Sequence, residues 1–224
     1  TRSWDVIIVG GGVIGSAIAH FLAAEPAFPG TILVVERDPS YARSSTALSA
    51  GSIRQQFSTR ENINISIFGF DFLKAIDEHL AMGAEAPDIG LVEAGYLFLA
   101  TDQGIDILRE SHAVQRGCDT AVALLSPDAL RERFPWLKAD DLAGGSLGLA
   151  GEGWFDAFAL LQAFRRSATA LGAVYVDDEV IGLTRAGDRI TGVTLRERGN
   201  VACGNCVNAA GPSAAALAAM AGIE

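Results

Sequence analysis

The feature that most constrains this chain is a glycine-rich turn between an apolar run and a helix-like segment. Val6-Ile7-Ile8-Val9 is a continuous apolar run, typical of a strand buried on both faces of a parallel sheet. Gly10, Gly12 and Gly15 follow with the spacing G-x-G-x-x-G, and residues 14–24 resemble a helix of small residues. Glycine costs backbone entropy, so this cluster predicts a close approach of bare backbone to a ligand, and a phosphate is the obvious candidate.

A second strand and an acidic residue complete the pattern of a dinucleotide-binding βαβ unit. The apolar run 31–35 ends at Glu36, 21 residues after Gly15, close to the separation of about 20 expected for an acid that binds ribose hydroxyls. Val13 and Ile14, at the start of the helix, would offer free N–H groups and the positive end of the helix dipole to phosphates. Glu36 would repel a 2′-phosphate, which disfavours NADP. The unit is predicted to bind ADP, which FAD and NAD share.

Charge and composition exclude several classes of partner. The formal net charge is −10, and 50% of the 224 residues are hydrophobic. An acidic chain is a poor match for nucleic acid, whose binders carry basic patches, and for an anionic lipid surface. No apolar run reaches the roughly 18–20 residues needed for a transmembrane segment. Three cysteines are too few for a disulfide framework, so a cytoplasmic location is expected.

The remaining pattern alternates helices and strands. Ser58-x-x-Glu61 has the form of a capping box and predicts a helix through about Ala81, with a buried stripe. Ser126-Pro127 predicts the start of a short helix. The stripe is expected to include Ile63, Ile67, Phe70 or Phe72, Leu73, Ile76 and Leu80. Further helices are expected at 102–117, 156–171 and 214–221, and strands at 89–100, 122–125, 174–176, 180–185, 190–196 and 201–208.

This order predicts an α/β fold. We expect a Rossmann-like FAD-binding domain with a parallel sheet and a β-meander, together with part of an inserted α+β substrate domain. The FAD-binding domain would be discontinuous, formed by residues 1–84 and 151–224, and residues 85–150 would belong to the substrate domain.

An ordered set of segments carries a family resemblance along nearly the whole chain. These segments are VGGGVIGSAIAHFL, VVERD, RSSTALSAGSIRQQFS, EAGYLFLA, GEGWFDAFALLQAFRRSATALGA and VNAAGPSA. In this order they resemble the FAD-dependent amino acid oxidase (DAO) superfamily, which includes sarcosine oxidases and dimethylglycine dehydrogenases. SAGSIRQQFS, FPWL and GEGWFD are more similar to a branch of mitochondrial FAD-dependent oxidoreductase domain proteins linked to the assembly of respiratory complex I. The resemblance implies FAD as the cofactor.

The resemblance also implies roles for matching residues. Ser44 and Ser45 match a loop near the pyrophosphate and flavin, with plain turn chemistry as the alternative; residues 50–53 would run beside the isoalloxazine. The strand at Val180 would meet the adenine, and the turn 209–211 would close over the phosphates. The predicted cofactor-binding residues are Gly10, Gly12, Val13, Ile14, Gly15, Glu36, Arg37, Ser44, Ser45, Ala50, Gly51, Ser52, Ile53, Val180, Ala209, Ala210 and Gly211.

The chain departs from the family pattern at three points. Leu48 stands where a histidine carries covalent flavin in dimethylglycine and sarcosine dehydrogenases, so non-covalent FAD is expected. Pro212-Ser213 replaces a frequent Pro-Trp pair. Family members also continue well past the NAAG turn, so the chain is expected to be an N-terminal fragment that lacks much of the catalytic half.

Few residues remain as candidates for the chemistry. Arg54 follows the flavin-facing loop and could bind a substrate carboxylate through two hydrogen bonds, and a surface or flavin-positioning ion pair is its alternative. Gln55 and Gln56 are weaker candidates near the ring. Cys203-Gly-Asn-Cys206 lies within a predicted strand, not at a helix start, and is interpreted as structural; no metal site is predicted.

Two functions from different classes remain open. The first is oxidation of a C–N bond in a small amino acid or N-methylated amine, with hydride transfer to flavin and an unknown electron acceptor. The second is a flavin-bound assembly protein for a respiratory complex with little turnover. An NAD-dependent dehydrogenase is a third, more distant interpretation.

Overall fold

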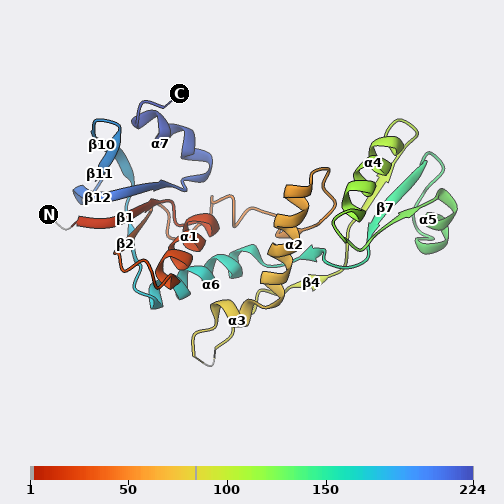
Figure 1. The fold of residues 1–224 in the computed structure, drawn as a ribbon, viewed down its shortest axis with the longest axis horizontal. Helices are drawn as coiled ribbons and strands as arrows, with labels where there is room; N and C mark the ends of the chain where they lie inside the picture. Colours follow the sequence, from red (N-terminus) through yellow and green to blue (C-terminus); the bar gives the residue numbers. More distant parts are fainter. Residues whose placement is uncertain (1–2, 84, 224) are drawn as a thin grey trace. The chain divides into compact units, whose positions relative to one another are not determined.

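The computed structural model describes residues 3–83 and 85–223 of the chain. The apolar run at the start forms β1 (Ser3–Val9), and Ile7 and Ile8 are fully buried. Helix α1 (Val13–Ala24) follows, and β2 (Ile32–Glu36) then lies parallel to β1 (Figure 1). The predicted βαβ unit is therefore confirmed.

The main sheet has six strands in the order β10-β11-β12-β1-β2-β9. β12 (Gly199–Asn208) and β9 (Val174–Asp177) extend the parallel part on either side of β1 and β2. β10 (Val180–Ala186) and β11 (Arg189–Leu195) continue antiparallel from β12 and form the meander. The expected Rossmann-like sheet with a β-meander is confirmed.

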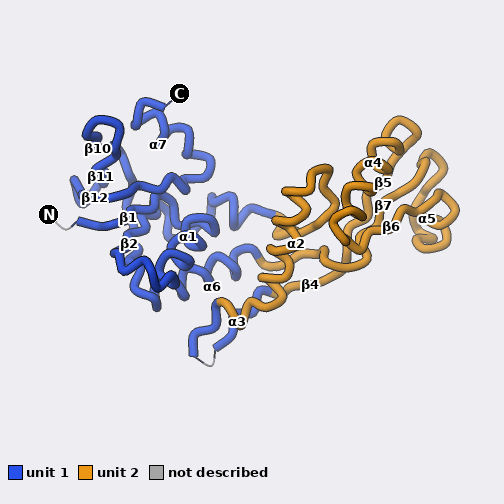
Figure 2. Tube along the Cα trace, viewed as in Figure 1, with its two compact units in different colours: residues 1–49, 80–89, 157–224 blue, residues 50–79, 90–156 orange. Residues whose placement is uncertain are grey.

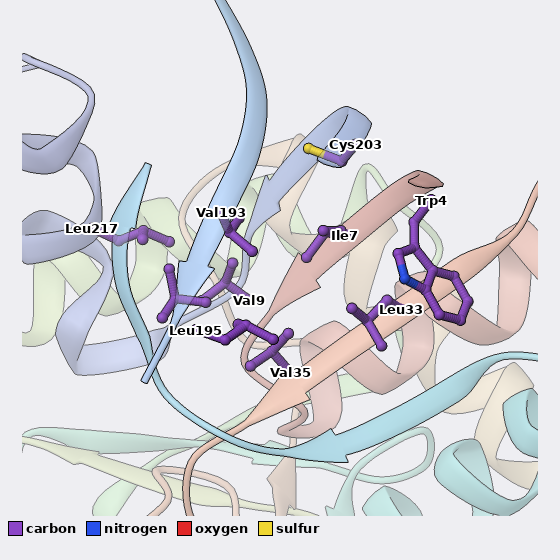
Figure 3. Packing of buried hydrophobic residues seen from close by; sticks show 10 residues of the cluster. Trp4, Ile7, Val9, Leu33, Val35, Val193, Leu195, Cys203 and Leu217 are labelled. Atoms are coloured by element: carbon purple, nitrogen blue, oxygen red, sulfur yellow. The ribbon is translucent and has the colours of Figure 1, made fainter. Parts of the chain in front are cut away.

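Alternate residues of β1 bury opposite faces of this sheet. Ile7 and Val9 belong to one apolar cluster with Leu217 of α7 (Ala214–Met220), as Figure 3 shows. Val6 and Ile8 belong to a second cluster, with residues of α1 and α6 (Ala157–Ala170). Burial on both faces explains why the strand is apolar throughout instead of alternating.

The other strands form two small antiparallel sheets. One contains β3 (Ser52–Ile53), β8 (Gly153–Trp154) and β4 (Val92–Glu93), in the order β3-β8-β4. The second contains β5 (Leu97–Ala100), β7 (Gly144–Gly148) and β6 (Val122–Leu125), in the order β5-β7-β6. The remaining elements are α2 (Arg60–Lys74), α3 (Ile76–Leu80), α4 (Ile105–Arg116), α5 (Pro127–Arg133) and a 3-10 turn, η1 (Gly211–Ser213).

Contacts divide the chain into two compact units (Figure 2). Unit 1 contains residues 1–49, 80–89 and 157–224, and unit 2 contains residues 50–79 and 90–156. This grouping differs from the expected domains mainly at residues 50–79, which group with the inserted segment. The assignment of functions to the expected domains stays a prediction.

Two expected elements have different bounds. The prediction of a capping box at Ser58 is wrong, because α2 begins after Thr59, which makes no side-chain capping hydrogen bond. The helix expected through Ala81 is divided, since Ala75 separates α2 from α3. The expected strand 89–100 is two short strands, because Gly95 between them has a φ of 75°. The buried stripe is confirmed at Ile63, Phe70, Leu73, Ile76 and Leu80.

Candidate cofactor-binding site

The glycine turn is built on two close backbone approaches in unit 1. Gly10 has a φ of 102°, and a methyl group there would collide with the carbonyl oxygen of Ala209. A methyl group at Gly15 would collide with the carbonyl oxygen of Gly10 and contact Ile8. These contacts explain why only glycine fits at the first and third positions of the motif.

Gly12, the second glycine, is open to a ligand instead. It is the N-cap of α1 and has extended geometry without a side-chain capping hydrogen bond. A methyl group there would find a single neighbour within 4 Å, Thr46 Oγ1 at 3.5 Å. Ile14, in the first helical turn, is 64% exposed. The start of α1 therefore exposes backbone at Gly12 and the apolar side chain of Ile14. Such a surface fits a ligand that contains both a phosphate and an aromatic ring.

Glu36 points back at this turn from the end of β2. Its Oε2 accepts a hydrogen bond from the Gly11 N–H at 2.8 Å, and its Oε1 accepts one from the Asp38 N–H at 2.9 Å. The half-buried carboxylate is thereby fixed beside the glycine turn, as the spacing predicts. Arg37, the next residue, is exposed.

The serine-rich stretch contacts the turn through a different residue than the two serines that the resemblance selects. The Ser44 hydroxyl accepts a hydrogen bond from the Ala47 N–H at 3.1 Å, which is turn chemistry, and Ser45 is exposed. Thr46 accepts a hydrogen bond from the Val13 N–H at 3.2 Å and satisfies one free donor of α1. A hydroxyl two residues from Ser44 was the available signal for Thr46.

Tyr41 supports the turn from behind and was also missed. It is 1% exposed with a φ of 56°, and a methyl group at Gly11 would lie 3.2 Å from its hydroxyl. The guanidinium of Arg165 lies 5.7 Å from the centre of its ring. Burial raises the pKa of Tyr41 to about 12, and the negative charge of Glu36 contributes to the rise. Its position in a polar stretch gave no sign of this burial.

The turn after β12 meets the glycine turn from the other side. The Ala209 N–H donates to the Val9 carbonyl at 2.9 Å, and the Ala210 N–H donates to Asn208 Oδ1 at 3.3 Å. Gly211 has a φ of 55° and is exposed. The structure therefore brings residues 209 and 210 to Gly10, and closure of this turn over the phosphates stays a prediction.

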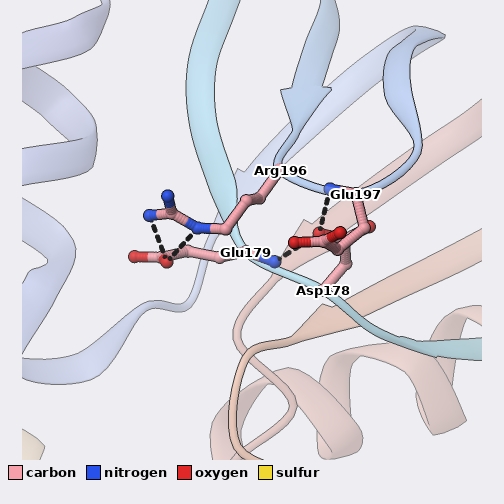
Figure 4. A network of polar contacts seen from close by, with 4 residues as sticks. All are labelled: Asp178, Glu179, Arg196 and Glu197. Carbon is pink, nitrogen blue, oxygen red and sulfur yellow. Dashed lines mark hydrogen bonds and ion pairs between the residues drawn. The ribbon is translucent and has the colours of Figure 1, made fainter.

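The strand that is expected to meet the adenine begins at an anchored loop (Figure 4). Asp178 accepts hydrogen bonds from the N–H groups of Glu179 and Glu197, and its own N–H donates to the Glu36 carbonyl at 3.0 Å. Burial alone would raise the pKa of Asp178, but these bonds and one from Arg198 together lower it. Glu179 pairs with Arg196 at 2.7 Å. Val180, the first residue of β10, therefore follows a loop whose backbone is hydrogen-bonded to the end of β2.

The predicted flavin-facing residues lie in unit 2 and are described within it. Ala50 is exposed, whereas Gly51 is buried with a φ of 58°. Ser52 and Ile53 form β3 and pair with Trp154 and Gly153 of β8. The Phe155 N–H donates to the Gly51 carbonyl at 2.7 Å, so the loop is fixed by main-chain bonds.

Arg54 directly follows this strand and is held by aromatic rings. Its guanidinium carbon lies 4.9 Å from the ring centre of Phe57 and 5.7 Å from that of Phe98. Its Nε is buried without a hydrogen-bond partner, and no carboxylate pairs with it among the residues that the structure describes. The guanidinium therefore has hydrogen-bonding capacity that an anionic ligand could use.

Cys203 and Cys206 lie within β12 and are free thiols. Burial raises the pKa of both, that of Cys206 to about 11, which opposes the thiolate form that redox and metal chemistry need. Over the described ranges 3–83 and 85–223, no group of three His, Cys, Asp or Glu side chains could hold a metal ion. None of the helices in those ranges combines the length and apolar character needed to span a bilayer.

The main sheet has four parallel strands, a glycine turn at their carboxyl edge and an acid at the end of β2, which together define a dinucleotide-binding protein of the Rossmann-like class. Residues 5–224 match the family described as "FAD dependent oxidoreductase" (DAO). The chain belongs to this family, and FAD is the cofactor that the open start of α1 and the acid at Glu36 fit.

Named relatives agree with this assignment. The chain is 43% identical over 240 residues to FAD-dependent oxidoreductase domain-containing protein 1 of Xenopus laevis, covering 98% of this chain and 48% of that protein. It is 32% identical to glycine oxidase of Geobacillus kaustophilus, covering 100% of this chain and 59% of that protein. Among solved structures, L-proline dehydrogenase from P. horikoshii matches with a TM-score of 0.85 at 26% identity, covering 100% and 57% of the two chains. The chain thus spans about half the length of these relatives.

Proposed function

We propose that the protein, with non-covalently bound FAD, oxidises a C–N bond of a small amino acid or N-methylated amine. FAD, when bound, supplies a two-electron acceptor for the hydride that leaves the carbon next to nitrogen, giving an imine that water hydrolyses. Support comes from relatives named for glycine and L-proline, both small amino acids. One of these relatives is named an oxidase and one a dehydrogenase, so the electron acceptor stays open.

In this proposal the glycine turn and Glu36 bind the ADP part of FAD. The Val13 N–H, expected to be free, already donates to Thr46, so the pyrophosphate would meet the other N–H groups at the start of α1. Glu36 accepts hydrogen bonds from the adenosine ribose. The turn 209–211 closes over the phosphates, and residues 50–53 run beside the flavin ring. Leu48, which is 72% exposed, offers no atom for covalent attachment.

The observation that carries the substrate assignment is the unpaired guanidinium of Arg54. A planar fork of N–H donors matches a carboxylate through two parallel hydrogen bonds, and the rings of Phe57 and Phe98 keep that fork in one place. Since the residue follows the loop expected beside the flavin, a carboxylate bound there would hold an amino acid by its acid end. Arg54 is therefore proposed to bind the substrate carboxylate.

The test is anaerobic reduction of the flavin in the full-length protein by glycine, N-methylglycine and L-proline, each compared with its amide. We expect the acids to bleach the flavin and the amides to fail. Replacement of Arg54→Met should raise the concentration for half-reduction about 100-fold, because the bidentate pair is lost. The exposed Arg109, which pairs with Asp106 on α4, is the matched control as Arg109→Met.

A flavin that stays oxidised with every amine and amino acid tested contradicts the oxidation proposal and leaves the flavin-bound assembly protein as the function to pursue. Absence of a flavin spectrum would contradict both. The cytoplasmic location expected from the cysteine content is also a proposal, tested by fractionation of cells that express the full-length protein.

A further inference from the structure

Unit 2 contains a fully buried carboxylate that the proposed chemistry does not use. Glu152 lies in the GEGWFD segment between β7 and β8 and is 0% exposed. Within the described part of the chain no cationic side chain pairs with it. A buried charge without a counter-ion is unfavourable unless hydrogen bonds replace its hydration, so its presence calls for a structural or functional reason.

Four N–H donors satisfy this carboxylate. Its Oε1 accepts from the backbone N–H groups of Gln55, at 2.7 Å, and Gln56, at 3.1 Å. Its Oε2 accepts from Gln56 Nε2 at 2.9 Å and from the Tyr96 N–H at 3.1 Å. Each oxygen therefore receives two donors, and no position is left for an N–H group in place of either oxygen.

The backbone around Glu152 is shaped to admit this side chain. A methyl group at Gly148 would collide with Glu152 Oε2, and a methyl group at Gly151, where φ is 75°, would collide with the side chain of Gln55. The Glu152 carbonyl also accepts from the N–H groups of Ala94 and Gly95 at 3.1 and 3.0 Å. The residue thus joins the segment after β3 to the segment between β4 and β5.

The two backbone donors on Oε1 belong to the residues that directly follow Arg54. The side chain of Gln56 extends the network, since its Nε2 also donates to the Tyr96 carbonyl at 2.9 Å and its Oε1 accepts from Ser146 Oγ at 2.6 Å. Glu152 therefore bonds the main chain at the two residues between Arg54 and Phe57, and Phe57 is one of the two rings that contact the guanidinium.

We infer that Glu152 is a positioning residue for Arg54: its carboxylate fixes the Arg54–Gln56 backbone so that the guanidinium stays oriented toward an anionic ligand. The role of the guanidinium in substrate binding rests on the proposed function, but its fixation by Glu152 does not. A carboxylate is required because an amide in the same place would direct an NH₂ group at N–H donors.

The first test measures the guanidinium itself. In full-length protein labelled with ¹⁵N-arginine, the Nε–H resonance that disappears in Arg54→Lys identifies Arg54. We expect Glu152→Gln to shift or broaden this resonance without added ligand, whereas the exposed Glu110→Gln on α4 leaves it unchanged. If Glu152→Gln does not fold, Glu152→Asp keeps the charge, shortens the reach and should move the same resonance. An unmoved Arg54 resonance in a folded variant overturns the inference, whether or not the protein oxidises amino acids.

The second test uses turnover with L-proline or glycine. Glu152→Gln should raise KM about tenfold and change kcat less than about threefold, because the lost orientation affects binding of the carboxylate. In an Arg54→Met background the same replacement should change KM less than about twofold, since the positioned group is gone. If the effects of Glu152→Gln and Arg54→Met on KM multiply, or if Glu152→Gln lowers Tm and leaves KM unchanged, the role of Glu152 is purely structural. Failure of wild-type protein to oxidise any amino acid or N-methylated amine would refute the proposed function and leave the resonance test decisive.

Discussion

At the scale of single residues, Gly10 has two separate reasons to be glycine. Its φ of 102° disfavours any L side chain, and a Cβ atom would collide with the Ala209 carbonyl, which is backbone and cannot rotate away. We predict that Gly10→Ala destabilises the protein by more than about 2 kcal/mol and releases FAD, measured by urea unfolding and by the flavin content after purification.

Gly172 is the matched control for this prediction. It has the same φ of 102°, but a Cβ atom there would meet nothing within 4 Å. Gly172→Ala should therefore cost only about 1 kcal/mol, the conformational part of the penalty, and keep its flavin. If Gly10→Ala and Gly172→Ala lose equal free energy of unfolding, the contact with the Ala209 carbonyl adds nothing to the cost at Gly10.

Cys206 gives a prediction about pH. Burial raises its pKa from 9.0 to about 11, so at pH 8 the thiolate fraction should be about 100-fold below that of an ordinary thiol. We expect alkylation of Cys206 by iodoacetamide to be slower by about that factor in the folded than in the urea-unfolded protein, as followed by peptide mapping. Because folding raises this pKa, the contribution of Cys206 to stability is constant below pH 9 and falls as pH rises from 9 to 11. A folded-state rate equal to the unfolded one at pH 8 would contradict the assignment.

At the scale of elements, two serines that the sequence marks as helix starts behave differently. Ser126 accepts a hydrogen bond from the Ala129 N–H at 3.2 Å and caps α5, whereas α2 begins after Thr59 and leaves Ser58 outside the helix. We predict that Ser126→Ala costs about 1 kcal/mol and Ser58→Ala costs close to zero, measured by thermal unfolding. A larger loss for Ser58→Ala would show that the capping box forms in solution.

The same comparison shows what local patterns can predict. The helix start predicted from Ser126-Pro127 is confirmed, because the cap and the proline act within one helical turn. The helix expected through Ala81 is interrupted at Ala75, where no glycine or proline gives a local signal. Periodicity still predicted its buried residues, since Ile63 and Leu73 face the interior whichever way the helix divides.

Site residues follow the same division between local and non-local causes. The meeting of Gly10, Gly15 and Glu36 at one turn was predictable because their spacing reflects one βαβ unit, and their binding of a cofactor stays a prediction. Tyr41 and Glu152 were not, because each is defined by partners brought together by the fold: Tyr41 by Gly11 and Arg165, and Glu152 by donors 56 to 97 residues away. A buried carboxylate satisfied by main-chain N–H groups leaves no charge pattern in the sequence.

At the scale of the whole molecule, the first βαβ unit depends on strands from the other end of the chain. β1 pairs with β12 and β2 pairs with β9, so both neighbours of this pair come after residue 156. We predict that a chain ending at Asp156 cannot build the sheet of unit 1, because β12 and β9, the strands on either side of β1 and β2, are missing together with α6.

Trp4 reports on this sheet, since it is 6% exposed, whereas Trp136 and Trp154 are 77% and 48% exposed. With Trp136→Phe and Trp154→Phe in place, fluorescence from Trp4 should be blue-shifted and protected from iodide in the full chain. In the chain that ends at Asp156 it should be red-shifted and quenched. Protected Trp4 emission in the shortened chain would refute the dependence on β9 and β12.

The pairing of Val9 with Asn208 also has a consequence for biosynthesis. About 200 residues separate these partners, and translation at roughly 5–20 residues per second leaves the first strand waiting on the order of 10–40 s for its neighbour to be made. During that interval its apolar surface is open to chaperones and to other nascent chains. Aggregation of the incomplete chain is therefore expected to compete with folding on the ribosome, before the cofactor has anywhere to bind.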